Sequence, residues 1–167
     1  DGVYGDHEAR FPETLLESSI HSPISPEEML DAIICFKGNC LMQPASLFRR
    51  TVFEKVGGFS EEYGIASDYK WFLDALQMPS ITFTQIPRTI VSYAHGGRSG
   101  NLRELFEEIF DIQTKDALCQ TSDWALKRMQ ALQQDFLQKY EALQQFQQLA
   151  NRRKDHLNQL KLRSEEG

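Results

Sequence analysis

Apolar residues recur at helical spacing after the stretch Ser25-Pro26-Glu27-Glu28. A serine N-cap, a proline at the first helical position and a glutamate at the third form a capping box, which satisfies free amides where a helix begins. The apolar residues that follow share one face of such a helix: Met29, Leu30, Ile33 and Ile34. We therefore expect a helix here that packs against a core.

Two further helices are expected on either side of a glycine-rich loop. The first covers residues 45–56 and should end at Gly57 and Gly58, because glycine enters positive-φ conformations at little cost. The second should have Ser67 as its N-cap and Asp68 as its first helical residue. Its apolar face comprises Trp71, Phe72, Ala75 and Leu76, so we expect that face to be buried.

Apolar and polar residues alternate with a period near two over residues 81–86 and 89–93, on either side of Pro87. This pattern predicts two strands. A helix is then expected from Leu102 to Ile112. Its apolar residues would close the domain against the sheet, with the acidic residues on the far face: Leu102, Leu105, Phe106, Ile109, Phe110 and Ile112.

The N-terminal segment shows little periodicity. Residues 2–5 are a short strand candidate, and residues 9–26, with three prolines and several serines, are expected to form a surface loop. Asp6-His7-Glu8 between them could suggest a metal site. Consecutive residues of an extended chain point to alternate sides, however, so we interpret this cluster as a solvated loop.

The composition shifts near residue 120 from apolar to rich in Gln, Lys and Arg. We therefore expect an α/β domain over residues 1–118 and a helical extension over residues 119–167. Apolar residues at alternating spacings of three and four predict a helix from 123 to 163, about 60 Å long. They are Met129, Leu132, Phe136, Leu143, Phe146, Ala150, Leu157 and Leu160, interrupted by Lys139 and Arg153. This pattern favours a coiled coil that self-associates, and the alternative is a single helix folded back on the domain.

Composition excludes several classes of protein. The formal charge of -6, from 18 basic and 24 acidic residues, argues against nucleic acid as a partner. The cysteines Cys35, Cys40 and Cys119 suggest neither a disulfide framework nor a zinc site, and are typical of buried thiols in a reducing compartment. No charged-then-apolar leader and no run of about 18 apolar residues is present, so the sequence predicts neither export nor a membrane span.

Asp68 is the strongest candidate for chemistry. A carboxylate at the start of a helix is stabilised by the helix dipole and by free amides, so we expect it to stay ionised and able to accept a proton. Aspartate is also common at helix starts for structural reasons alone. From the residues themselves, both interpretations of Asp68 stay open.

A set of short motifs occurs in order along residues 1–110. They are Val-Tyr-Gly-Asp at 3–6, Pro-Ala-Ser-Leu-Phe-Arg-Arg at 44–50, Phe-Glu-Lys-Val-Gly-Gly-Phe at 53–59, Ile-Ala-Ser-Asp-Tyr at 65–69 and Gly-Gly-Arg-Ser at 96–99. Together they resemble the C-terminal half of a family 2 glycosyltransferase of bacterial polysaccharide biosynthesis. The resemblance implies a GT-A fold, a nucleotide-sugar donor, a glycan or lipid-linked acceptor, a divalent metal (Mg or Mn) and inversion at the sugar carbon. It also implies a cytoplasmic enzyme, working there or at the inner face of the membrane.

The resemblance assigns roles to particular residues. Asp68, in the Ile-Ala-Ser-Asp-Tyr motif, corresponds to the general base. Asn39 and Gln43 are acceptor-contact candidates, although Gln43 stands where the family usually has a histidine and cannot take up a proton. Arg98 is a candidate for binding the diphosphate of the donor, because a guanidinium group matches phosphate oxygens in bidentate geometry. His95 is a candidate metal ligand.

The resemblance also covers only part of such an enzyme. The family's nucleotide-binding half ends in an Asp-x-Asp metal motif, which is not found in this chain. We therefore expect roughly a hundred further residues before Val3 in a complete enzyme, by the usual size of a domain. Two functions remain: an inverting glycosyltransferase, or a non-catalytic remnant or scaffold that acts through its C-terminal coiled coil.

Overall fold

The computed structural model describes residues 1–167 except 11–15, 20–24, 38–40, 95–96 and 166–167, and the side chains except those of 7–24, 38–40, 93–96, 99 and 155–167. The chain divides into two compact units, Asp1–Ala125 and Leu126–Gly167. The first is a mixed α/β unit and the second is helical. Within the described residues, no helix is both long enough and apolar enough to cross a membrane.

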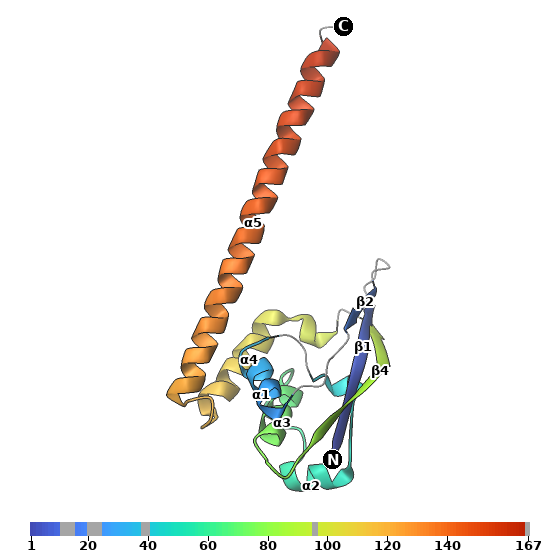
Figure 1. Ribbon diagram of the computed structural model, residues 1–167, viewed down its shortest axis with the longest axis vertical. Coiled ribbons are helices and arrows are strands. Elements are labelled where there is room, and N and C mark those ends of the chain that lie inside the picture. The colour runs from blue at the N-terminus through green and yellow to red at the C-terminus, as the bar shows by residue number, and fades with distance from the viewer. Residues whose placement is uncertain (11–15, 20–24, 38–40, 95–96, 166–167) are drawn as a thin grey trace. The chain divides into compact units, whose positions relative to one another are not determined.

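The sheet of the first unit, drawn in Figure 1, is built around strand β1 (Gly2–Arg10). Strand β4 (Phe83–Ala94) pairs with β1 in parallel from Gly2 to Arg10. On the other edge, β3 (Ser46–Phe48) pairs antiparallel with the first residues of β1, and β2 (Leu16–Ser19) pairs antiparallel with its last residues. Both edges of β1 are therefore occupied by strands, which makes it the centre of the sheet.

The solvated loop expected at residues 6–8 is wrong. Strand β1 continues through Asp6-His7-Glu8 to Arg10, because these residues pair with β4 on one side and, from His7 onward, with β2 on the other. Asp6 is 7% exposed. The surface loop expected over 9–26 is likewise interrupted by β2, and pairing between distant segments explains both differences.

A single strand replaces the two that were expected around Pro87. The β1–β4 register shifts between Gly5 and Asp6, where Gly5 lies opposite Ile86 and Asp6 opposite Thr89. Pro87 therefore lies in a bulge, where a residue without an N–H can be tolerated inside a strand. Gly5 is needed here, since a Cβ at this position would lie 2.4 Å from Cδ1 of Ile90.

The helix expected over 45–56 is correct only in its second half. Residues Gln43–Ala45 form the 3-10 turn η1, Ser46–Phe48 form β3, and helix α2 covers Arg50–Val56. The reason is pairing of β3 with Gly2–Tyr4, which overrides the local pattern. The expected stop is confirmed, because Gly57 follows α2 with a φ of 93°.

Helix α1 (Pro26–Ile34) begins with the expected capping box. The Glu28 N–H donates to Oγ of Ser25 at 3.2 Å, and the Ser25 N–H donates to Oε2 of Glu28 at 2.7 Å. Of the predicted apolar face, Met29 and Ile34 are buried and Leu30 and Ile33 are partly buried against the core. This helix is an element whose start and orientation the local residues predicted correctly.

Replacing Ser25 by alanine should destabilise the first unit by about 1 kcal/mol, because it leaves the Glu28 N–H without its cap. Ser25→Asp should restore most of the loss, since aspartate is an equally good N-cap. Urea unfolding followed by the fluorescence of the buried Trp71 measures both. Equal losses in the two variants would show that the cap contributes nothing.

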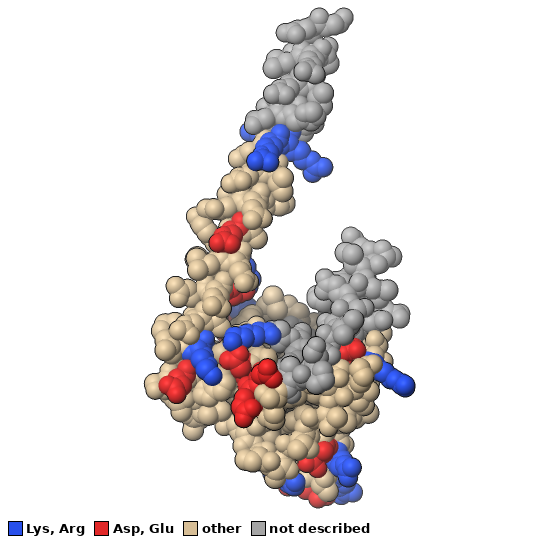
Figure 2. All heavy atoms as spheres, in the orientation of Figure 1, with Lys and Arg blue, Asp and Glu red and all other residues tan. Residues whose placement is uncertain are grey.

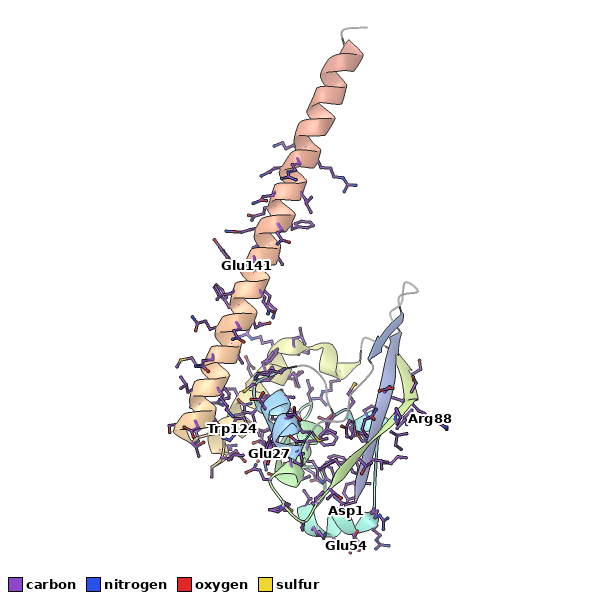
Figure 3. The ribbon with its side chains drawn as sticks, viewed as in Figure 1. Asp1, Glu27, Glu54, Arg88, Trp124 and Glu141 are labelled. Atoms are coloured by element: carbon purple, nitrogen blue, oxygen red, sulfur yellow. The ribbon has the colours of Figure 1, made fainter. Side chains whose placement is uncertain are left out.

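The core lies between the sheet and helices α1 and α3 (Ser67–Leu76), where Figure 3 shows closely spaced side chains. Trp71 is 2% exposed and its ring contacts Phe48, Phe53 and Phe59 at centroid distances of 4.6 to 5.7 Å. The predicted buried face of α3 is confirmed: Trp71, Phe72, Ala75 and Leu76 are all buried. Cys35 and Cys119 are buried and form no disulfide, as expected.

Helix α4 (Leu102–Lys115) packs differently from the expectation. It buries Ile109, Ile112 and Gln113, while Leu102, Phe106 and Phe110 are 49 to 67% exposed. Its acidic residues are also not all on the far face, because Glu108 contacts the loop before α3. The last helix, α5 (Ser122–Glu165), is continuous over 44 residues, as the sequence predicted.

Candidate functional site

The loop of residues 57–66, called here the α3 loop, leads from the end of α2 to the start of α3. Its glycine end is fixed to the core, because the indole Nε1–H of Trp71 donates to the carbonyl oxygen of Gly57 at 2.9 Å. Its other end delivers Ser67 and Asp68 into the first turn of α3. The position of Asp68 therefore depends on how this loop is held.

Asp68 is the second residue of α3, one position later than expected, and the N-cap is Ala66 rather than Ser67. Alanine has no side-chain acceptor, so the N-cap makes no side-chain hydrogen bond. Oδ1 of Asp68 accepts the backbone N–H of Tyr69 at 2.7 Å. Asp68 thus satisfies one free amide of the first turn, and its carboxylate is half-buried.

The pKa of Asp68 moves in the direction opposite to that expected from a helix start. Burial raises the pKa, and the backbone N–H groups of Tyr69 and of Asp68 itself lower it by less, so the pKa lies above its ordinary value of 3.8. Desolvation disfavours the charged form of a carboxyl group. A raised pKa makes this carboxylate a better proton acceptor than a solvated aspartate when it is ionised.

A carboxylate from α4 satisfies the amides that no local side chain caps. Glu108 accepts the N–H groups of Gly64 at 2.9 Å, Ile65 at 2.9 Å and Ala66 at 2.7 Å. Desolvation raises the pKa of Glu108, but the three amides and the charge of Arg98 outweigh it, so the pKa is lowered overall. Glu108 therefore stays ionised and pins the end of the α3 loop next to Asp68.

The structure places Arg98 against the same loop. Arg98 opens the short turn η2 (Arg98–Gly100), and a Cβ added to Gly64 would lie 2.8 Å from its Nη2. The guanidinium also forms an ion pair with Glu104, with Nη2 and Oε1 3.4 Å apart. Of the residues predicted from the sequence, Asp68 and Arg98 are thus brought to the same segment, because Arg98 lies against Gly64, four residues before Asp68.

Further contacts join α4 to the other end of the loop. The Tyr63 hydroxyl donates to Oδ2 of Asp111 at 3.0 Å, and Nζ of Lys115 lies 2.6 Å from carboxylate oxygens of both Asp111 and Glu62. Hydrogen bonds to Asp111, then Glu62, raise the pKa of Lys115. These groups lie on one side of α4 with Glu108, so the helix holds the loop at several points.

A buried amide links the Ile-Ala-Ser-Asp-Tyr segment to α1 and α4. Nε2 of Gln113, which is 3% exposed, donates to the Tyr69 hydroxyl at 2.7 Å and to the carbonyl oxygen of Ile34 at 3.1 Å. Neither Gln113 nor Glu108 was singled out from the sequence. The only available signal was a polar residue beside Ile109 and Ile112 in an apolar pattern, which is also typical of a solvent-facing position.

The other site residues predicted from the sequence are Asn39, Gln43 and His95. Asn39 and His95 lie outside the described residues. Gln43 is exposed at the start of η1. Among the side chains that are described, no three His, Cys, Asp or Glu residues are grouped so that they could hold a metal ion. The described part of the chain therefore does not supply a ligand set for the metal that the resemblance implies.

No protein-family model, curated protein or solved structure matches this chain at a significant level. The fold is established as mixed α/β from its own geometry. The resemblance to family 2 glycosyltransferases is an expectation from the order and content of the sequence motifs.

Proposed function

We propose that this chain forms the acceptor side of an inverting, family 2-like glycosyltransferase with a GT-A fold, and that Asp68 is its general base. The observation that supports this most is the α3 loop, whose amides are held by Glu108 so that a half-buried carboxylate of raised pKa stands at the start of α3.

In the proposed reaction, the Asp68 carboxylate accepts the proton of an acceptor hydroxyl. The hydroxyl oxygen forms a bond to the anomeric carbon of the donor, and the bond from that carbon to the nucleotide diphosphate breaks on the opposite face. The diphosphate leaves with the electron pair, and the configuration inverts. Asn39 and Gln43 are proposed to hydrogen-bond the acceptor.

Arg98 is proposed to bind the departing diphosphate, whose negative charge a guanidinium can neutralise in bidentate geometry. Its side chain is 70% exposed and its present partner is Glu104, so the diphosphate would replace a surface ion pair of small energy. No step is assigned to a metal, since the described residues do not form its ligand set.

The test compares this chain with a longer protein that carries an Asp-x-Asp half before Val3. The longer protein should transfer sugar from a nucleotide-sugar donor, whereas the 167-residue chain should show neither transfer nor nucleotide binding, because a base without a bound donor has nothing to act on. Calorimetry with nucleoside diphosphates and a coupled assay of diphosphate release measure both. Transfer by the 167-residue chain alone would contradict its assignment to the acceptor side.

The second candidate is a non-catalytic scaffold that acts through α5. It is favoured by the exposed apolar side chains of that helix, which an isolated catalytic domain would not need. Absence of Asp-x-Asp from the residues encoded upstream would favour the scaffold over the enzyme.

A further inference from the structure

The second unit carries a set of large apolar side chains that stay exposed along α5. Each is between 48% and 70% exposed: Leu126, Met129, Leu132, Phe136, Leu137, Tyr140, Leu143, Phe146 and Leu149. Figure 3 shows side chains projecting outward from the described part of this helix, Glu141 among them. A helix rarely leaves so much apolar surface uncovered in water.

These side chains follow a heptad repeat. With Met129, Phe136 and Leu143 at position a, Leu132 and Phe146 occupy position d. Of the other exposed apolar residues, Leu126 and Tyr140 are at e, Leu149 is at g, and Leu137 alone lies on the outer face at b. Positions a, d, e and g form one continuous side of a helix. Eight of these nine exposed side chains therefore face the same way.

The outer side of the helix is polar. Positions b, c and f between residues 130 and 152 carry mainly Gln, with Glu141 and Arg152. On the face shown in Figure 2, charged groups occur on the described part of α5 as separate groups with uncharged surface between them. The apolar side is therefore a seam with a defined width, and the repeat continues in sequence to Leu160, which exceeds the three to four heptads typical of a coiled coil.

Two basic residues, Lys139 and Arg153, occupy d positions in this seam. Nζ of Lys139 lies 2.7 Å from Oδ2 of Asp135, one turn earlier at position g. The ammonium is thus drawn to the edge of the seam and neutralised within its own helix. Its aliphatic stem stays available for packing, as is usual for lysine at an apolar surface.

We propose that the seam of α5 docks a second copy of this chain in an antiparallel two-stranded coiled coil. This inference does not depend on the proposed enzymatic function. In a parallel pair each d residue would face its own equivalent, which would place Lys139 against Lys139 and Arg153 against Arg153. In an antiparallel pair each d residue faces an a residue of the second copy. When the midpoints of the two seams coincide, Lys139 therefore lies opposite Phe136 of the second copy.

The size of the seam fits such a dimer. Eight side chains, each about half exposed, offer roughly 100 Å² apiece and about 800 Å² per copy, which is the usual contribution of one partner to a stable interface. Phe136 and Tyr140 are already stacked, with centroids 6.3 Å apart. They form a preorganised apolar ridge near the centre of the seam.

The first test is the mass of the whole 167-residue chain at tens of micromolar, by sedimentation equilibrium. We expect twice the 19.3 kDa of one chain. The double variant Phe136→Glu and Phe146→Glu should weaken association by roughly 100-fold or more, because it would bury unpaired charges. The matched control is Leu137→Glu, which adds a charge to an exposed apolar site outside the seam and should change association by less than about threefold.

A monomeric wild-type chain, or an assembly of three or more copies, would overturn the proposal. So would a Leu137→Glu variant that dissociates as readily as the double variant. Helical circular dichroism of the double variant separates loss of association from loss of the helix. A double variant that stays dimeric would show that the seam is not the interface and would also overturn the proposal.

The orientation is tested with a nitroxide label on an Arg152→Cys variant, in which Cys35, Cys40 and Cys119 are replaced by alanine and the dimer mass is verified. In the antiparallel pair the two labels should lie roughly 40 Å apart along the helix axis. A parallel pair would bring them to the same height, with a short distance between the labels, and would overturn the proposed orientation.

Discussion

Asp68→Asn in the complete enzyme that we propose is expected to lower turnover by roughly 10² or more, because the amide keeps the shape of the side chain but cannot accept the proton. Oδ1 of the asparagine can still accept the Tyr69 N–H, so the free energy of unfolding should change by less than about 1 kcal/mol. Steady-state kinetics and chemical unfolding of the same preparations measure the two effects.

Asp74→Asn is the matched control for this substitution. Asp74 lies on the same helix and forms an ion pair with Lys70, so its replacement should leave turnover nearly unchanged. A purely structural Asp68 would give normal turnover in Asp68→Asn, because the asparagine keeps the hydrogen bond to the Tyr69 N–H. Normal turnover in Asp68→Asn would remove Asp68 from the mechanism.

The pH dependence provides a second readout of the same residue. Turnover should fall as the pH drops through the pKa of Asp68, and this limb should lie above the ordinary 3.8 because burial raises that pKa. A raised pKa in the folded state means that Asp68 contributes stability at low pH, and that this contribution is lost as the pH rises through the raised value. Asp68→Asn should abolish both dependences.

Glu108→Ala should destabilise the first unit by about 2 to 3 kcal/mol, because three backbone N–H groups lose a charged acceptor together. These amides are those of Gly64, Ile65 and Ala66. The α3 loop would be freed next to Asp68, so turnover of the complete enzyme should fall as well. Urea unfolding followed by Trp71 fluorescence measures the change in stability.

The neighbouring Glu107 offers a matched control. It is exposed and forms an ion pair with Arg103 on the same helix, with Nε and Oε1 3.0 Å apart, so Glu107→Ala should cost less than about 0.5 kcal/mol. The pKa of Glu108 is lowered in the folded state. Its contribution should therefore be present above the ordinary 4.5 and be lost as the pH falls through the lowered value. Equal losses in the two variants would mean that the three hydrogen bonds contribute nothing to stability.

The features that the sequence determined by itself are those whose energy comes from residues close together in the chain. The capping box of Ser25 and Glu28, the positive-φ stop at Gly57, the buried face of α3 and the long helix α5 each depend on groups within a few residues or on a repeated spacing. Local patterns of this kind act before any tertiary contact forms. The place of Asp68 near a helix start was predicted in the same way, whereas its role as a base comes from the resemblance.

Only the tertiary structure decided the sheet. Residues 46–48 follow a helical pattern but become β3 because they pair with Gly2–Tyr4, and β1 extends to Arg10 because β4 lies beside it. Hydrogen bonds between segments separated by some 40 to 80 residues cannot be seen in a local period. The bulge that lets Pro87 lie within β4 depends likewise on the absence of a side chain at the distant Gly5.

The support of the candidate site was decided in the same way. Ser67 was a reasonable N-cap by composition, yet the amides at the end of the α3 loop are satisfied by Glu108, which lies 42 to 44 residues further along the chain. An acidic residue of an amphipathic helix has the same sequence pattern whether it faces water or another segment. Its function here was set by the packing of α4 against the loop, because only that packing brings an ionised carboxylate within hydrogen-bonding distance of three backbone N–H groups.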